Sequence, residues 1–277
     1  MHALCRKMSA ITPTASPPTG PDCTGTSDRQ RARDALLALA DADKAKFLDG
    51  FFKTGPGQYG EGDRFLGIVV PAIRQVAKQF RLLSLPDCEA LLASPYNEER
   101  LLALLILVGR YQQGDVITQE NVYQLYLAHR QRVNNWNLVD SSAPAIVGTH
   151  LLTRDRSVLV ELARSPTLWD RRIAVLATLT FIRAKDFSDT LRLAELLLAD
   201  PQDLMHKACG WMLREVGKRD ATVLEDFLSL HQRAMPRTTL RYAIERFTAD
   251  KRAALLAGTF TPARSLPPTD SARQCRS

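Results

Sequence analysis

The chain has 277 residues, of which 45% are hydrophobic, and a formal net charge of +7 at pH 7. One large domain needs no disulfides at this length, and no stretch reaches the roughly 18 uninterrupted apolar residues of a membrane span. The positive charge favours a polyanionic partner. An odd number of cysteines, scattered along the chain, predicts reduced thiols in a cytoplasmic protein: Cys5, Cys23, Cys88, Cys209 and Cys275.

Both ends of the chain have the composition of flexible segments. Residues 1–28 are rich in Pro, Thr, Ser and Gly and lack the apolar run of a secretory signal, so we expect a disordered leader. Residues 261–277 predict a flexible tail, because three prolines and several Ser and Arg occur there. The interval 29–260 is expected to form the folded domain.

Two short helices are predicted over residues 29–39 and 43–52, followed by a glycine-rich loop over 53–63. Residues 55–60 match the G-x-G-x-x-G pattern, but a dinucleotide site needs a preceding strand and a parallel sheet. We therefore interpret the segment as a polar loop whose Tyr59 contacts a ligand. Pro71 then suits the first turn of another helix.

From about residue 86 a repeat becomes visible. Ser94-Pro95, Ser165-Pro166, Asp200-Pro201 and Met235-Pro236 each precede a short polar cap and a mostly apolar helix. Few stretches alternate at period two, so no sheet is expected. The repeat predicts an all-α chain that forms a curved solenoid of HEAT-like helix pairs with a concave basic face.

The same period relates several residues of unusual chemistry. Arg100, Trp136, Arg172 and Lys207 follow one another at intervals of 36, 36 and 35 residues, which places them on one face of the stack. Asp140 lies one helical turn after Trp136, and Trp211 one turn after Lys207. An aspartate between indoles could stabilise a developing cation. The alternative, equally consistent with the pattern, is that both tryptophans belong to the core and Asp140 caps a helix or forms a salt bridge.

Cations are frequent in the second half of the chain. Arg171 and Arg172 begin a helix, where a phosphate would be attracted, although a pair with Asp170 or another acid is as consistent. For each remaining cation a solvated surface is the alternative to a contact with the nucleic-acid backbone. The candidates are Lys207, Arg214, Lys218, Arg219, Arg237, Arg241 and Arg246. The histidines lack zinc-site spacing and no nucleophile motif occurs, so no metal or cofactor is expected.

Over residues 33–247 the chain resembles the AlkD-type DNA alkylation repair glycosylases, a family with a HEAT-like fold. Four segments carry the resemblance: Phe65-Leu66-Gly67-Ile68 with Pro71, Trp136-Asn137-Leu138-Val139-Asp140, Trp169-Asp170-Arg171-Arg172-Ile173-Ala174 and Lys207-Ala208-Cys209-Gly210-Trp211-Met212-Leu213-Arg214-Glu215. The second and fourth are distinctive together. Asn137, where many relatives carry Asp, and Val69, where a polar residue can contact DNA, depart from the family pattern.

The resemblance implies that Trp136 and Trp211 are the aromatic pair at the lesion, Asp140 the catalytic carboxylate and Arg172 an arginine near the DNA backbone. It predicts a monomeric, cytoplasmic, nucleoid-associated DNA glycosylase that releases purines alkylated at N3 or N7 from duplex DNA without pulling the base into a pocket. DNA contacts are expected from Arg171, Lys207, Arg214, Lys218, Arg237, Arg241, Tyr59 and Pro71. A non-catalytic binder of damaged or branched DNA, and more remotely a protein scaffold, remain alternatives.

Overall fold

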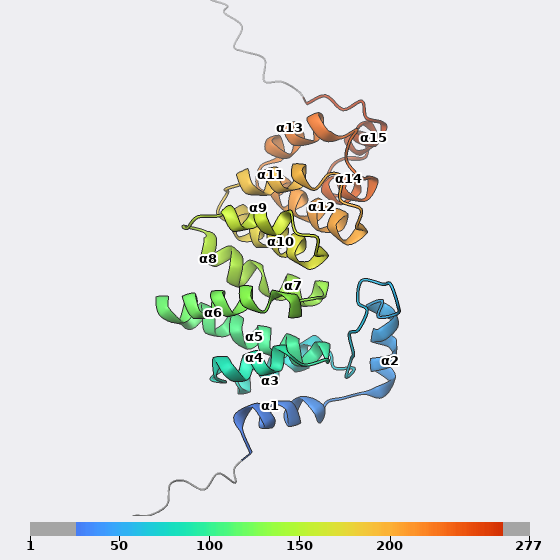
Figure 1. Cartoon of the computed structure of the whole chain (residues 1–277). Coiled ribbons are helices and arrows are strands. Elements are labelled where there is room, and N and C mark those ends of the chain that lie inside the picture. Colours follow the sequence, from blue (N-terminus) through green and yellow to red (C-terminus); the bar gives the residue numbers. More distant parts are fainter. Residues whose placement is uncertain (1–25, 263–277) are drawn as a thin grey trace, which may run out of the picture.

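The computed structural model describes residues 26–262, and all regular elements in this range are helices (Figure 1). They are α1 (Asp28–Leu37), α2 (Ala42–Phe51), α3 (Val70–Gln79), α4 (Leu85–Leu92), α5 (Asn97–Gln113), α6 (Val116–Ala128), η1 (Arg130–Arg132), α7 (Trp136–Ser142), η2 (Pro144–Gly148), α8 (Thr149–Leu151), α9 (Ser157–Ala163), α10 (Leu168–Arg183), α11 (Ser188–Leu196), α12 (Asp203–Gly217), α13 (Ala221–His231), α14 (Arg237–Ala243) and α15 (Ala249–Ala257). No strand forms between residues 26 and 262, which confirms the all-α prediction there. The leader and the tail predicted at the two ends lie almost wholly outside this range.

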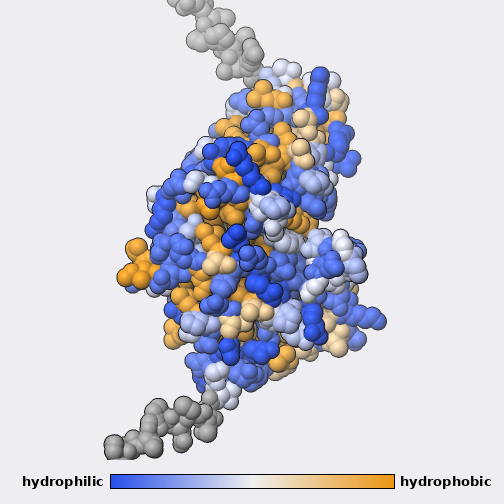
Figure 2. Space-filling view, in the orientation of Figure 1, coloured by the Kyte–Doolittle hydropathy of each residue, from blue (hydrophilic) through white to orange (hydrophobic). Residues whose placement is uncertain are grey.

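The helices are stacked in chain order (Figure 1). α5, α7, α10, α12 and α14 form a row in which each packs against the next. Flanking helices cover this row, with α4 and α6 on α5, α9 on α10, and α11 and α13 on α12. The outline is indented between α14 and the loop that follows α2 (Figures 1 and 2). We call α5, α7, α10, α12 and α14 the inner helices.

Three of the four Pro-marked turns predicted from the sequence contain the same type of hydrogen bond, from a backbone N–H to a side chain two residues earlier. The Ser94 hydroxyl accepts from the backbone N–H of Tyr96 at 3.1 Å, and the Ser165 hydroxyl accepts from that of Thr167 at 3.1 Å. Asp200 does the same for Gln202 at 2.9 Å. A short polar side chain thus turns the backbone before each helix start. These turns lead into α5, α10 and α12, whereas the fourth copy differs because Pro236 itself is the N-cap of α14.

The helical segment that begins at Trp136 changes from α-helical to π-helical hydrogen bonding at Pro144. α7 passes directly into the π-helical segment η2, which begins at Pro144 and packs against α10. Proline has no N–H to continue the ladder. The Pro144 carbonyl instead accepts from the hydroxyl of Thr180 on α10 at 2.7 Å and from that of Thr149 at 3.3 Å. This fixes the end of α7 that carries Asp140 against α10.

The segment 52–69, between α2 and α3, folds back onto α5. Both carboxylate oxygens of Glu98 accept backbone N–H groups of this segment, from Leu66 at 3.0 Å, Gly67 at 2.9 Å and Ile68 at 3.3 Å. Gly67 has φ +82°, and a Cβ there would lie 2.0 Å from the Asp41 carbonyl oxygen. Only glycine fits such a position. The Phe-Leu-Gly-Ile motif therefore attaches the α2 region, by which we mean α2 and the segment 52–69 that follows it, to α5.

One core cluster extends from α1 to α12 without a residue of α2, and a smaller cluster joins α13, α14 and α15. Cys88 and Cys209 are free thiols buried in it, as expected for two of the five cysteines, and burial raises the pKa of each to about 12. In the described residues no helix is long and apolar enough to span a membrane.

Candidate functional site

The geometry around Asp140 is dominated by an arginine from the next inner helix. Arg172 on α10 donates from Nε to one carboxylate oxygen of Asp140 and from Nη2 to the other, both at 2.9 Å. Its Nη1 donates to the Leu204 carbonyl oxygen at 2.7 Å, at the start of α12. Such two-point pairing fixes the carboxylate in orientation as well as position. The structure therefore joins two of the four predicted central residues directly.

The Asp140 side chain is 19% exposed, and that of Arg172 is 6% exposed. Burial raises the pKa of Asp140 above its ordinary value, while the Arg172 hydrogen bonds and charge act in the opposite direction. A partly desolvated anion in a fixed geometry interacts strongly with nearby positive charge, because little water is present to screen it. The positive charge beside Asp140 in this structure is Arg172, so Asp140 forms a salt bridge, as the alternative interpretation of the sequence expected.

Trp136, one turn before Asp140 on α7, is half-buried against aromatic rings of the α2 region. Its ring stacks on Phe52, with centroids 5.0 Å apart and planes inclined by 21°. Phe51 meets it edge-on at 6.1 Å, and Phe52 stacks in turn on Phe65 at 4.7 Å. Trp136 is neither free nor sealed in the core, which is an outcome between the two alternatives that the sequence left open.

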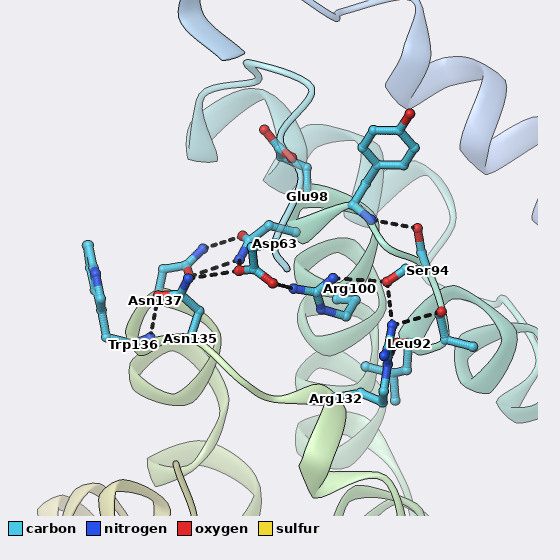
Figure 3. Close-up of polar contacts among 12 residues, drawn as sticks. Asp63, Leu92, Ser94, Glu98, Arg100, Arg132, Asn135, Trp136 and Asn137 are labelled. Carbon is cyan, nitrogen blue, oxygen red and sulfur yellow. Dashed lines mark hydrogen bonds and ion pairs between the residues drawn. The ribbon is translucent and has the colours of Figure 1, made fainter. Parts of the chain in front are cut away.

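A buried carboxylate fixes the backbone before Trp136 (Figure 3). Asp63 accepts from the side-chain amides of Asn97 at 2.9 Å and Asn135 at 2.8 Å, and it pairs with Arg100, which is fully buried. The side-chain amide oxygen of Asn135, Oδ1, in turn accepts the Trp136 backbone N–H at 2.8 Å. These contacts tie the glycine-rich loop to α5 and to the start of α7.

Sequence reasoning did not single out Asp63, Asn97 or Asn135. The only signal was the placement of Arg100 one repeat before Trp136, which located the residue but not its acidic partner. Asn137, the departure from the family pattern, donates to Asn97 at 2.7 Å. It therefore belongs to the same network.

Trp211 is half-buried on α12, one turn after Lys207. Its ring makes no aromatic pair with that of Trp136, as judged from the described residues. Gly210, beside it in the motif, packs so closely on α14 that a Cβ would lie 2.5 Å from the Cβ of Tyr242. Leu176 lies one turn after Arg172, as Asp140 does after Trp136 and Trp211 after Lys207, and it is fully buried in the core.

Several cations expected to contact DNA already have partners in the protein. Arg171 pairs with Asp200 at 2.6 Å, which is the acid partner that the sequence left open, and Lys207 pairs with Asp203 at 2.7 Å. Arg214 pairs with Glu245, Lys218 pairs with Glu215, and Arg237 donates to the Leu256 carbonyl oxygen. Arg241 is exposed and forms no ion pair with a residue of the range 26–262. Their contacts with DNA stay predictions.

Tyr59 and Pro71 lie at different places around the site. The Tyr59 ring meets the buried Trp169 edge-on at 6.2 Å, so the glycine-rich loop reaches α10. Its hydroxyl donates to the Phe51 carbonyl oxygen at 3.3 Å. Pro71 is exposed in the first turn of α3, as predicted, and lines a cavity that Asp140 also lines. Residues 26–262 contain no group of three or more His, Cys, Asp or Glu placed to hold a metal ion.

In a comparison with known protein families, residues 32–247 match the family model described as "DNA alkylation repair enzyme". Among solved structures, the chain is similar to a "Predicted DNA alkylation repair enzyme from Enterococcus faecalis". The two share 15% sequence identity with a TM-score of 0.60, over 76% of this chain and 98% of that one, which is a likeness of fold. No curated protein matches the chain.

Proposed function

Because the chain belongs to the DNA alkylation repair enzyme family, we propose that it is a monofunctional DNA N-glycosylase acting on purines alkylated at N3 or N7 in duplex DNA. The observation that carries the proposal is the partly buried Asp140 carboxylate held at two points by Arg172. The resemblance to AlkD-type glycosylases adds that the base leaves without being drawn into a pocket. The role of Asp140 does not depend on that point.

The chemistry suits a fixed anion. A purine alkylated at N3 or N7 is cationic, so the bond between C1′ and the base nitrogen breaks with its electron pair moving to the base, which leaves neutral. Positive charge builds on the sugar, and a water molecule adds to C1′ and gives up a proton. Asp140 would stabilise the charge on the sugar and orient or deprotonate the water. Little acid assistance to the leaving group is needed.

We propose that DNA binds on the indented side, with the helices acting as a curved HEAT-like solenoid. In support, the inner helices follow one another in a row, and Trp136, Arg172 and Lys207 lie at or near the starts of three of them. Cations there would contact phosphates, and Trp136 and Trp211 would contact the distorted nucleotide. Arg172, already paired with Asp140, would act by holding it.

The test is release of 7-methylguanine from alkylated duplex DNA under single-turnover conditions. Wild type should release the base, and Asp140→Asn should be slower by roughly a hundredfold or more, the scale of losing one electrostatic element of a catalytic site. Asp226→Asn is the matched control, because Asp226 is exposed on α13 and its side chain forms no ion pair with another residue of the range 26–262. Equal rates for wild type and Asp140→Asn would remove Asp140 from the mechanism.

The second candidate is a non-catalytic binder of damaged or branched DNA. It is favoured by one observation, that both Asp140 oxygens are already engaged by Arg172. This candidate predicts salt-dependent binding of alkylated duplex without base release in the same assay.

A further inference from the structure

The carboxylate of Asp63, the last residue of the glycine-rich loop, lies among hydrogen-bond donors from two other parts of the fold (Figure 3). Its Oδ2 accepts from the side-chain amides of Asn97 on α5 and Asn135 before α7, and its Oδ1 pairs with Arg100 of α5. Asp63 is only 6% exposed, so little water competes for these bonds. One buried anion therefore joins the loop to α5 and to the start of α7.

Two separate routes lead from Asp63 to the beginning of α7. Asn135, the fully buried N-cap of α7, donates to Asp63 with its amide NH2 and accepts the Trp136 backbone N–H with its Oδ1. Asn97, the second amide on Asp63, accepts with its own Oδ1 from the Asn137 side chain at 2.7 Å. The residues on both sides of Trp136 are thus tied to the same carboxylate.

The helix held in this way carries the candidate catalytic residue. α7 has only seven residues, and Asn137 and Asp140 are three apart on one face of it. Both line the same cavity, together with Trp136. Arg172 of α10 holds Asp140 from the other side. The Asp63 network therefore determines where the start of α7 lies relative to α5, while α10 fixes the carboxylate.

The network requires an acid at this position. All three groups that bond the Asp63 carboxylate are donors, and a carboxylate is a side chain that only accepts. An asparagine would turn its NH2 either toward Arg100 or toward the two amides, so a donor would meet a donor. Turning the Asn135 amide to relieve this would place its NH2 against the Trp136 N–H.

Resting on the proposed function, we propose that Asp63 is a positioning residue for base release. Through Asn135 and Asn97 it would set the place of Trp136 and Asp140 against the bound nucleotide. Its own side chain is buried, so it would act through the two asparagines and not by touching DNA. Displacing a reacting group by about 1 Å can cost roughly a hundredfold in rate, so a remote carboxylate of this kind affects the chemistry.

Asn135→Ser tests the link without removing Asp63. Serine remains a good N-cap, but its shorter side chain lacks the amide that donates to Asp63. Asp63→Asn is the direct variant, and it also weakens the pairing of the buried Arg100, so stability has to be measured beside it. The matched control is Asp115→Ser, which makes the same kind of N-cap replacement at the exposed start of α6. Urea unfolding establishes which variants are folded.

The readout is single-turnover release of 7-methylguanine as a function of protein concentration. Asn135→Ser should lower the maximal rate by roughly tenfold. The protein concentration at half-maximal rate should stay within about twofold of wild type, because no cation is changed. Asp115→Ser should retain both values within about twofold. An unchanged maximal rate in folded Asn135→Ser would overturn the positioning role of Asp63, whereas no release by wild type would overturn the proposed function instead.

A second measurement does not depend on catalysis. In protein labelled with 5-fluorotryptophan, the ¹⁹F resonances of Trp136 and Trp211 are assigned by replacing each with phenylalanine. Asn135→Ser should shift the Trp136 resonance and leave that of Trp211 in place, and Asp115→Ser should move neither. A Trp136 resonance that stays in place in Asn135→Ser would overturn the inference whether or not the protein releases bases.

Discussion

Phe52 and Trp136 lie nearly face to face, at 5.0 Å between ring centroids, although one ends the α2 region and the other begins α7. One face of the candidate lesion-contacting indole is therefore already covered by the protein. Phe51 meets the same indole edge-on at 6.1 Å, and Trp136 also lines the cavity that Asp140 lines. Trp136 would thus meet a nucleotide as one wall of an aromatic stack.

Arg172→Lys should preserve charge but lose the two-point hold on Asp140. A lysine ammonium cannot donate to both oxygens in the fixed geometry of a guanidinium, and the bond to the Leu204 carbonyl is lost too. We expect excision to fall by roughly tenfold or more and the free energy of unfolding by about 1–3 kcal/mol. Single-turnover kinetics and urea unfolding measure the two effects. Unchanged kinetics in a destabilised variant would limit Arg172 to a structural role.

The pH dependence of excision should reflect the raised pKa of Asp140. If the anion is the active form, activity is lost as pH falls through that raised pKa, so the acid limb lies above the ordinary aspartate value of about 4. Arg172→Lys removes hydrogen bonds that lower the pKa, and its acid limb should move to still higher pH. Rates are measured from pH 4 to 8, with spontaneous depurination subtracted. A flat profile in this range would contradict the assignment.

Asp63→Ala should be strongly destabilising, because it leaves the fully buried Arg100 without its anion. Removing one partner of a buried pair costs about 3–5 kcal/mol. The double variant with Arg100→Met should recover much of this loss, since no unpaired charge remains. Urea unfolding of the two single variants and the double variant gives the coupling energy. Additive losses would mean that the pair is not the main reason for the burial of Asp63.

Gly210→Ala tests the packing of the second tryptophan motif. Its Cβ would lie 2.5 Å from the Cβ of Tyr242 and 2.6 Å from the Thr239 carbonyl oxygen, so α12 and α14 must separate. A loss of about 1–3 kcal/mol in the free energy of unfolding is expected. Gly109→Ala is the control. Gly109 lies within α5, and a Cβ added there would have no neighbouring atom within 4 Å apart from the backbone of its own helix, so this variant should raise the free energy of unfolding by about 0.5–1 kcal/mol. Equal effects at the two positions would refute the close approach.

The sequence predicted the parts of the molecule that repeat. Pro-marked turns at Ser94, Ser165 and Asp200 recur with the same hydrogen bond, and a recurring local pattern can be read without knowing the fold. The helix phase also placed Trp136 and Asp140 on one helix correctly. The family that the four motif segments indicated is the one whose model matches residues 32–247.

What the sequence could not predict comes from the segment that does not repeat. Residues 52–69 have no periodic pattern, so nothing in them indicated that Asp63 would meet Arg100 and Asn135, or that Phe52 would cover Trp136. Such contacts depend on the path of an irregular chain, which local propensity does not determine. The cavity beside Asp140 escaped notice for the same reason, since its walls come from four separate helices.

The glycine-rich loop also has a mechanical consequence. Asp63 fastens it to α5 and to the residue before α7, and Tyr59 rests on Trp169 of α10, so one short segment bridges three successive inner helices. A row of helices in which each contacts only its neighbours can bend. The glycine-rich loop, which contacts α5, the start of α7 and α10, would restrict changes in the angles between these three helices before any partner binds. Under the proposed function, a DNA duplex would meet inner helices whose relative angles are already fixed, and binding energy would be left for distorting the nucleic acid instead of the protein.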